Sequence, residues 1–491
     1  MPEQGFSFLV SFNPYHRQPT MNIQELYDIF TRCRIVTTDS RDCPEGALFV
    51  ALKGASFDGN AYAAQALQQG CAYAVIDNPR YAAEGDSRYI LVDDGLSALQ
   101  RLALTHRRTL RTPVIGVTGT NGKTTTKELI AAVLSKRYNV LYTQGNLNNH
   151  IGVPKTLLRL TDKHDIAVIE MGANHPGEIR ALTGIAEPDM GIITNVGRAH
   201  LEGFGSFEGV KRTKGELYDY LKGHDDGGII FINGDDADLL DMADERHITR
   251  RIQYGTTQNG RLSVRGEVVS CDPFLTFRWE KTCIRPAEQE PADCDLAPAT
   301  RDSYHSPTVS TKLIGSYNLY NMLAAAAVGC RFGVDEQDIN DALAGYVPSN
   351  NRSQMVVTEH NHLIVDAYNA NPTSMNAALT NFRDMHADNK MAILGEMGEL
   401  GSASDAEHLK TVRLLHTCGL REIWLVGRAF RKAMTTFDAE NGTERKNRPA
   451  VLLFDNVEDV KAAILADPPQ RHTILIKGSN ATKLFQLPPL L

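Results

Sequence analysis

The segment Val114-Ile115-Gly116-Val117-Thr118-Gly119-Thr120-Asn121-Gly122-Lys123-Thr124-Thr125 decides the class of fold. An apolar run rich in β-formers ends in a glycine-rich turn, and a helical pattern follows over residues 127–136. Glycines let backbone N–H groups converge on an anion, the helix N-terminus adds a favourable dipole, and the lysine adds a positive charge. The hydroxyl of Thr124 stands where Mg²⁺ on nucleotide phosphates takes an oxygen ligand.

The pattern departs from G-x-x-x-x-G-K-[ST], because Val117 stands five positions before Gly122. A plain strand–turn–helix corner is the alternative, but the flanking strand and helix favour a site for ATP or another nucleoside triphosphate.

Length and composition limit the number of domains and the class of protein. At 491 residues the chain is long enough for about three domains. Its hydrophobic content of 42% and charged content of 22% are ordinary for a globular protein. The net charge of −8 gives no basic footprint for nucleic acid, so local lysines, arginines and metal ions would have to hold a polyanionic substrate.

The cysteines and the apolar runs indicate the compartment. The eight cysteines contain no C-x-x-C pair, which is typical of reduced thiols in a cytosolic protein rather than of zinc ligands or disulfides. No apolar run reaches the length of a membrane span. The apolar residues 6–12 lack the basic flank and cleavage site of a signal peptide. We therefore expect a cytoplasmic protein.

The pattern of strands and helices predicts an α/β chain of three domains after an extension at residues 1–20. Residues 21–110 form a small α/β domain, with strands at 47–52, 74–76 and 89–92. Residues 111–348 form a doubly wound, mostly parallel sheet, with buried strands at 114–117, 166–170, 191–194 and 229–233. Periodicity dissolves between 262 and 310, which indicates a variable elaboration. Residues 349–491 form a Rossmann-like domain, with strands at 363–365, 391–394, 423–426, 451–454 and 474–476.

Polar residues that follow the buried strands are the candidates for a site, because ligands of such sheets bind at the carboxyl ends of strands. Glu170 ends a strand beside the glycine-rich turn and would hold Mg²⁺, with a solvated strand end as the alternative. His200 lies in a glycine-flanked loop and could ligate metal or contact phosphate. On composition alone, Lys214 belongs to a solvated basic helix face. Two further loops suit turn formation or substrate contact, Gly145–Pro154 with its asparagines and Asp366–Pro372 with its tyrosine and amides.

Taken in their order along the chain, these segments resemble the motifs of the Mur ligase family. The matching stretches are TGTNGKTTTK, GNLNNHIGVP, EMGANHPGEI, TNVGRAHLEGFGS, KRTKGE, GSYNLYNMLAAAA, DAYNANPTSM, LGEMGELG and KGSN. Within the family, YNANP, LGEMGELG and the N-terminal DSR…GALFVALKGASFDGN resemble the members that add D-alanyl-D-alanine to UDP-N-acetylmuramoyl-tripeptide. The chain departs from the family at Tyr317, where relatives often have His, and at Arg352, which lacks the common preceding Gly.

The resemblance implies roles for individual residues. ATP would be bound by Gly119, Thr120, Asn121, Gly122, Lys123, Thr124, Thr125, Asn321, Arg352 and Asp366. Two Mg²⁺ ions would be held by Thr124, Glu170, His200 and a carbamylated Lys214, which reverses the solvated reading of that lysine. Catalysis would rest on Lys123, Glu170, His200 and Lys214. The UDP-substrate would be contacted by Ser40, Arg41, Asn148 and Asn149, and the dipeptide or the domain closure would involve Tyr368, Asn369 and Asn371.

The implied reaction is ATP-dependent amide formation through an acyl phosphate, in a protein we expect to be monomeric. Two anions must be brought together, which explains Lys123 and the metal ions. The alternatives are a sibling ligase that adds a single amino acid such as diaminopimelate or lysine, a folylpolyglutamate-synthase-like ligase, and a nucleotide-binding switch or scaffold without ligase activity. The N-terminal DSR…LKG region argues against the folate enzyme, and a switch does not need a second metal site.

Overall fold

The computed structural model describes residues 20–224, 227–258, 262–282, 303–348, 351–441 and 448–491. They form two compact units, the first ending at His106 and the second running from Arg107 to Leu491, and each is described by itself. The predicted extension at residues 1–20 lies outside the described residues except for Thr20.

The first unit is a parallel four-stranded sheet with the order β1-β2-β3-β4. Its strands are β1 (Val36–Thr37), β2 (Leu48–Val50), β3 (Tyr73–Ile76) and β4 (Tyr89–Leu91), and its helices are α1 (Ile23–Cys33), α2 (Ala63–Gln68) and the first part of α3 (Gly95–Leu110). The sequence predicted three of these strands but not the two-residue β1. A capping box starts α1, because the Asn22 side chain accepts from the backbone N–H of Glu25 and the Glu25 side chain accepts in return.

The central sheet of the second unit runs β13-β12-β11-β10-β9-β8-β5-β7-β6, with β14 paired to β12. Its strands are β5 (Val114–Thr118), β6 (Val140–Tyr142), β7 (Ile166–Glu170), β8 (Met190–Ile193), β9 (Ile229–Asn233), β10 (Arg251–Gly255), β11 (Val264–Cys271), β12 (Phe274–Lys281), β13 (Tyr304–His305) and β14 (Val309–Ile314). All neighbours from β6 to β11 are parallel, and they include the four predicted parallel strands β5, β7, β8 and β9. The described residues of the stretch 262–310 are more regular than their sequence suggests, because β11, β12, β13 and β14 extend the sheet by antiparallel pairing. A register shift between Val268 and Ser270 interrupts the period-two pattern there.

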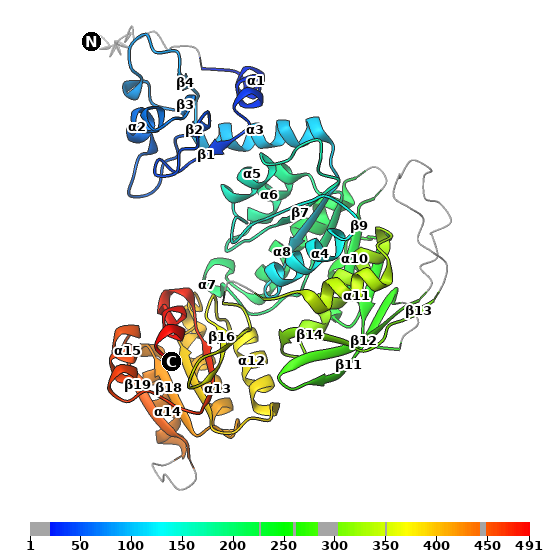
Figure 1. Cartoon of the computed structure of the whole chain (residues 1–491), viewed down its shortest axis with the longest axis vertical. Coiled ribbons are helices and arrows are strands. Elements are labelled where there is room, and N and C mark those ends of the chain that lie inside the picture. The colour runs from blue at the N-terminus through cyan, green and yellow to red at the C-terminus, as the bar shows by residue number, and fades with distance from the viewer. Residues whose placement is uncertain (1–19, 225–226, 259–261, 283–302, 349–350, 442–447) are drawn as a thin grey trace, which may run out of the picture. The chain divides into compact units, whose positions relative to one another are not determined.

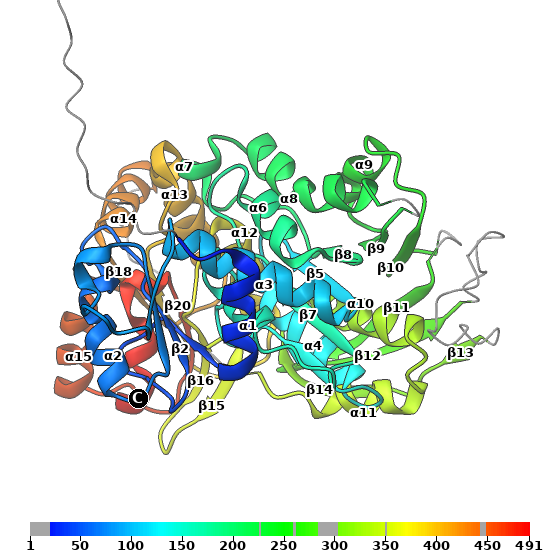
Figure 2. The ribbon, with the colours of Figure 1, turned by 90° about the horizontal axis from the view of Figure 1, so that it is seen from above.

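Helices cover both faces of this sheet, with α4 (Lys123–Leu134), α10 (Asn318–Arg331) and α11 (Glu336–Gly345) on one face (Figure 2). The other face is covered by α5 (Gly152–Leu157), α6 (Glu178–Ala186), α8 (Phe207–Lys222) and α9 (Ala237–Asp244). The strands are therefore buried on both sides, and every residue of β5, β7 and β9 is buried. The short helix α7 (Leu201–Phe204) follows β8.

The C-terminal sheet runs β15-β16-β20-β17-β18-β19. It belongs to the yellow-to-red part of the ribbon in Figure 1. Its strands are β15 (Gln354–Val357), β16 (His362–Asp366), β17 (Lys390–Gly395), β18 (Glu422–Val426), β19 (Ala450–Phe454) and β20 (Thr473–Lys477), all parallel except β15. One core joins it to α12 (Pro372–Asp384), α13 (Ser404–Leu415) and α14 (Arg428–Asn441). A second core, on the opposite face, includes α15 (Val457–Ala466). The predicted α/β class with two doubly wound sheets is confirmed.

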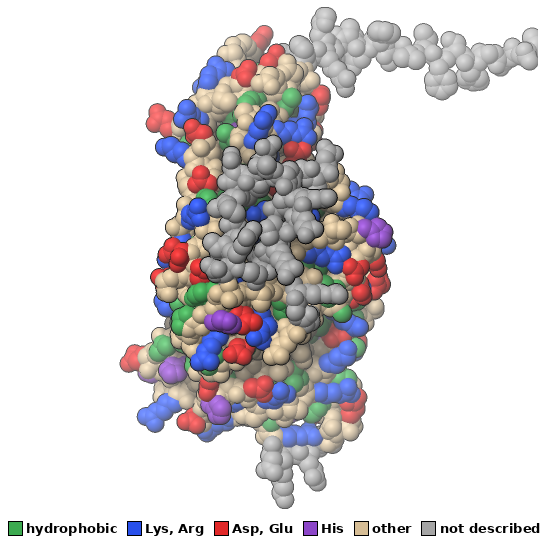
Figure 3. Space-filling view, turned by 90° about the vertical axis from the view of Figure 1, so that its right-hand side faces the viewer, with side chains coloured by type: hydrophobic (Ala, Val, Ile, Leu, Met, Phe, Trp, Pro, Cys, Tyr) green, Lys and Arg blue, Asp and Glu red, His purple; other side chains and the backbone are tan. Residues whose placement is uncertain are grey.

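Two further observations concern the surface. On the face drawn in Figure 3, lysine and arginine side chains are interspersed with aspartate and glutamate side chains rather than gathered by sign. Among the described residues, no helix combines the length and the apolar character that crossing a lipid bilayer would require.

Candidate functional site

The glycine-rich turn between β5 and α4 is held in one conformation by its neighbours. Gly119 has φ +140°, and a Cβ there would lie 2.0 Å from the Thr194 Oγ1, so only glycine fits. The Thr120 N–H donates to the Asn195 carbonyl (3.0 Å), and the Asn121 N–H donates to the Asn195 side chain (3.0 Å). The residues that follow β8 therefore shape the turn that follows β5, because these two strands are neighbours in the sheet.

Lys123 opens α4 and points back into the turn. Its ammonium donates to the carbonyls of Gly119 (2.7 Å) and Thr120 (2.9 Å). Burial lowers the pKa of Lys123 to about 8, although the nearby Glu170 carboxylate opposes this shift. An anion beside Lys123 would restore the stability of its charged form, which is what a phosphate in this turn would supply.

Glu170 lies at the end of β7 with 1% of its side chain exposed. Its Oε1 accepts from the Thr124 hydroxyl (3.1 Å) and from the Asn148 amide (2.8 Å). Its Oε2 is buried without a hydrogen-bond partner and lies 4.0 Å from the ammonium of Lys127. The predicted alternative of a solvated strand end is therefore wrong.

This donor set fits a divalent cation. A buried carboxylate oxygen with no hydrogen-bond partner beside a threonine hydroxyl is the oxygen environment that Mg²⁺ prefers, with phosphates and water completing its shell. The described residues contain no group of three or more His, Cys, Asp or Glu side chains arranged for a metal. A metal here would therefore depend on ligands that the nucleotide brings.

His200 and Lys214 both follow β8 in the chain, His200 directly before α7 and Lys214 within α8. His200 precedes α7, and its Nδ1 contacts the Oε2 of Glu399, a residue in the loop after β17. Burial lowers the pKa of His200, and the charges of Lys123 and Lys214 act in the same direction while Glu399 opposes them.

Lys214 is buried in α8, so the solvated helix face that composition alone predicted is wrong. Its ammonium donates to the Ala173 carbonyl (3.2 Å) and lies 5.3 Å from the centre of the Phe204 ring. Burial lowers the pKa of Lys214 well below that of an ordinary lysine, and the charge of Lys123 adds to this shift. This shift favours the neutral amine, which is the nucleophilic form of a lysine side chain.

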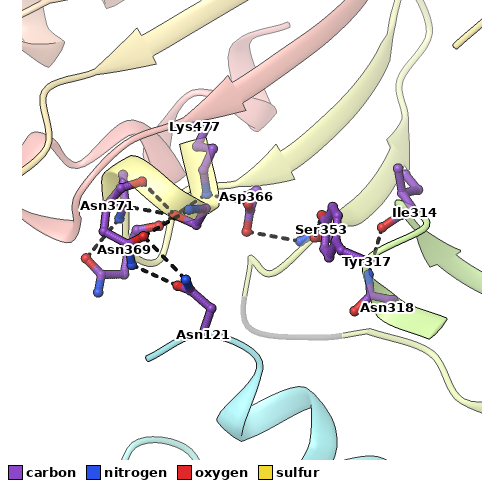
Figure 4. Close-up of polar contacts among 11 residues, drawn as sticks. Asn121, Ile314, Tyr317, Asn318, Ser353, Asp366, Asn369, Asn371 and Lys477 are labelled. Carbon is purple, nitrogen blue, oxygen red and sulfur yellow. Dashed lines mark hydrogen bonds and ion pairs between the residues drawn. The ribbon is translucent and has the colours of Figure 1, made fainter. Parts of the chain in front are cut away.

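The C-terminal domain contributes the facing wall, shown in Figure 4. Asp366 ends β16, and its Oδ2 pairs with the ammonium of Lys477 at the end of β20 (2.5 Å) while its Oδ1 accepts from the Ser353 N–H (3.3 Å). The guanidinium of Arg352 lies 3.9 Å from the centre of the Tyr368 ring, and its Nε is buried without a hydrogen-bond partner.

Polar side chains join this wall to the central domain. The amides of Asn371 and Asn121 exchange hydrogen bonds in both directions, at 2.8 and 3.4 Å. The Tyr317 hydroxyl lies 2.9 Å from the Ser353 Oγ, so this tyrosine has a partner in the C-terminal domain. The two domains therefore meet through specific hydrogen bonds around the glycine-rich turn.

A cavity of about 580 Å³ lies between these walls. Among the residues predicted to form the site, those that line it are Thr120, Asn121, Gly122, Lys123, Thr125, Asn148, Asn149, Glu170, His200, Asn321, Arg352, Asp366, Tyr368 and Asn369. Gly119, Thr124, Lys214 and Asn371 stand behind that lining and contact residues that belong to it. Ser40 and Arg41 belong to the first unit, where Arg41 pairs with Asp39 (2.7 Å).

Several lining residues have local hydrogen bonds that limit their roles. The Asn149 side chain accepts from the N–H groups of Ile151 and Gly152, so it shapes its own loop. The Asn321 amide accepts from the Thr126 hydroxyl (3.0 Å) and lies against Gly122. Sequence reasoning assigned no role to Lys477, Ser353 or Glu399. Lys477 follows a predicted strand and opens the KGSN stretch, and Glu399 lies in LGEMGELG, so both stood within segments that were already singled out.

Models of the three Mur ligase domains match successive parts of the chain. The model of the Mur ligase family catalytic domain matches residues 32–107, that of the Mur ligase middle domain matches 117–329, and that of the Mur ligase glutamate ligase domain matches 351–480. The chain is 33% identical over 92% of both chains to the UDP-N-acetylmuramoyl-tripeptide--D-alanyl-D-alanine ligase of Bacillus subtilis, and 32% identical over 92% of both to that of Escherichia coli. A crystal structure of MurF from Acinetobacter baumannii superposes with a TM-score of 0.77 at 28% identity, covering 95% of this chain and 97% of that one.

Proposed function

The chain belongs to the Mur ligase family, and from this membership we propose that it joins D-alanyl-D-alanine to UDP-N-acetylmuramoyl-tripeptide in an ATP-dependent reaction. The observation that carries the proposal is the cavity that brings the glycine-rich turn and Glu170 to face Asp366 and Arg352 of the C-terminal domain. The names of the curated relatives favour the dipeptide-adding ligase over the sibling ligase and the folate enzyme.

The first step would be phosphoryl transfer. An oxygen of the tripeptide's terminal carboxylate attacks the γ-phosphorus of ATP, the bond from that phosphorus to the bridging oxygen breaks, and ADP leaves with the electron pair. Lys123 and the backbone N–H groups of residues 119–125 would hold the phosphates, with Asn321, Arg352 and Asp366 around the nucleoside. Thr124 and Glu170 would hold Mg²⁺, which neutralises phosphate charge when bound.

The second step would form the amide. The amine of D-alanyl-D-alanine attacks the acyl carbon, the carbon–oxygen bond to phosphate breaks, inorganic phosphate leaves, and the nitrogen loses a proton. Tyr368 and Asn369 line the cavity from the C-terminal domain, and Asn371 fixes that domain against Asn121, so we assign them to dipeptide contact and closure. Closure would exclude water that hydrolyses an acyl phosphate. We assign Ser40 and Arg41 of the first unit, together with Asn148 and Asn149, to the UDP-substrate.

Lys214 would carry a carbamate that serves a second Mg²⁺ with His200. The lowered pKa favours the neutral amine, which can attack CO₂, forming an N–C bond and releasing one proton. The product is an anion. The positive charge of Lys123, which disfavours an ammonium on Lys214, would stabilise this anion. Enzyme equilibrated with ¹³C-bicarbonate should show a carbamate carbon resonance that is missing in Lys214→Arg.

The decisive experiment measures phosphate release and the UDP-linked product by mass spectrometry. Both should require ATP, the UDP-tripeptide and D-alanyl-D-alanine together, and tripeptides ending in diaminopimelate and in lysine should be compared. Lys123→Ala should slow ligation by about 10²–10³-fold, because it removes a preorganised positive charge from the phosphates. The exposed Lys222→Ala is the matched control. Near-normal ligation by Lys123→Ala would refute the proposal, and product formed from single amino acids but not from the dipeptide would favour the sibling ligase.

A further inference from the structure

Two loops from different domains meet at the edge of the cavity, one before α7 and one after β17. The Glu399 carboxylate contacts the His200 Nδ1, and the Glu399 carbonyl accepts from the Glu202 N–H (3.3 Å). Side chain and backbone of Glu399 therefore both engage the loop that carries His200. Nearby, Arg198 lies 3.8 Å from Glu407, which gives the same domain contact a second ion pair that does not involve the imidazole.

Both partners of the Glu399–His200 contact have unusual backbone conformations. His200 has φ +50° and Glu399 has φ +59°, in the left-handed region that L-residues enter only at an energetic cost. Such outliers persist where the surrounding structure fixes them and are concentrated at functional sites. Here each outlier directs its side chain at the other, so the strain lies where the two domains join.

The contact decides which imidazole nitrogen is available to a ligand. A carboxylate at Nδ1 keeps a proton on that nitrogen, which leaves the lone pair of Nε2 free. Because His200 lines the cavity, this arrangement prepares it as a metal or phosphate ligand. The carboxylate comes from the domain that also carries Asp366 and Tyr368, so the preparation depends on how that domain is seated.

We propose that Glu399 is a positioning residue that fixes His200 in the Nδ1-protonated tautomer and thereby links the seating of the C-terminal domain to the second metal position. The inference rests on the proposed function, because His200 has a ligand to hold only if nucleotide and metal bind in the cavity. Glu399 belongs to the LGEMGELG segment, and this positioning role is separate from the roles assigned above to the glycine-rich turn.

The test measures binding of Mn²⁺ to the full chain in the presence of a non-hydrolysable ATP analogue, by electron paramagnetic resonance. The component whose Mn²⁺ affinity falls measurably in His200→Asn defines the site. In Glu399→Gln that component should bind about 10–100-fold more weakly, the usual effect of removing a carboxylate behind a metal-bound histidine. Glu407→Gln, the matched control on the same domain contact, should bind Mn²⁺ as the wild type does.

Two further readouts separate positioning from a structural role. In the double variant His200→Asn/Glu399→Gln, Mn²⁺ binding should be no weaker than in His200→Asn alone, because Glu399 acts through the imidazole. In ¹⁵N-histidine spectra, the His200 resonance pattern should change from the Nδ1-protonated form in Glu399→Gln but not in Glu407→Gln. Additive losses in the double variant, or unchanged Mn²⁺ binding in Glu399→Gln, would overturn the inference. Wild-type ligation, measured in parallel, reports on the proposed function separately.

Discussion

The ion pair between Lys477 and Asp366 offers a sharp test of how the C-terminal wall is held. Lys477 ends β20, which lies between β16 and β17, and 1% of its side chain is exposed against 17% for Asp366. Its ammonium lies 2.5 Å from the Asp366 Oδ2 and 3.4 Å from the Asn369 carbonyl. Lys477→Met keeps most of the aliphatic stem but removes the charge, so Asp366 remains as a largely buried carboxylate with one backbone N–H near it.

Breaking a buried ion pair costs about 3–5 kcal/mol, and the partial exposure of Asp366 reduces this to about 2–3 kcal/mol. Hydrogen exchange in β16 and β20 should therefore accelerate by about 30- to 150-fold if both strands open together. Asp366→Asn in the Lys477→Met background should recover most of the loss, because it removes the uncompensated charge. Hydrogen exchange followed by mass spectrometry measures both effects. Equal exchange in wild type and Lys477→Met, or no recovery in the double variant, would refute the reasoning.

Three further outcomes are expected. Gly119→Ala should abolish ATP binding measured by calorimetry, because its Cβ would lie 2.0 Å from the Thr194 Oγ1, whereas Gly184→Ala, with nothing within 4 Å, should bind normally. Thr124→Val should raise the Mg²⁺ concentration for half-maximal ligation about tenfold or more, since the hydroxyl beside Glu170 is lost; an unchanged Mg²⁺ dependence would contradict its role. Burial lowers the pKa of His408 below 6.5, and its Nε2 accepts from the Met397 N–H (3.0 Å), so the folded state favours the neutral ring. Its contribution to stability is thus present above pH 6.5 and lost as the pH falls through the folded pKa, by at most about 1.4 kcal/mol per pH unit. Urea unfolding of His408→Gln should show a flatter dependence, and an equally steep one would exclude this cause.

Local patterns in the sequence predicted the elements that build the site. β7 and β9 have the bounds read from their apolar runs, because a strand buried on both faces shows as a continuous apolar segment. The glycine-rich turn was equally readable, since left-handed φ angles at Gly119 and Gly122 are needed by any such turn. The helix α4 begins at Lys123, four residues before the helical pattern over residues 127–136 that indicated it.

The strands within residues 262–310 and the burial of Lys214 were harder to predict from the sequence. The strands β11 and β12 pair with each other in a long antiparallel arm whose bulge hides its alternation. Lys214 sits among polar neighbours in the sequence, and its burial follows only from packing of α8 against β8 and α7. The resemblance to the Mur ligase family implied a place for Lys214 in a metal site, whereas composition alone predicted a solvent-exposed side chain.

By itself, the sequence determined that a glycine-rich turn opens a helix after a buried strand and that polar residues such as Glu170 end the neighbouring strands, because these properties depend on residues adjacent in the chain. Only the tertiary structure decided which distant residues meet. Glu399 reaches His200 across 199 positions, and Lys477 reaches Asp366 across 111. Such pairs depend on strand order and on how two domains pack, and no local periodicity encodes either.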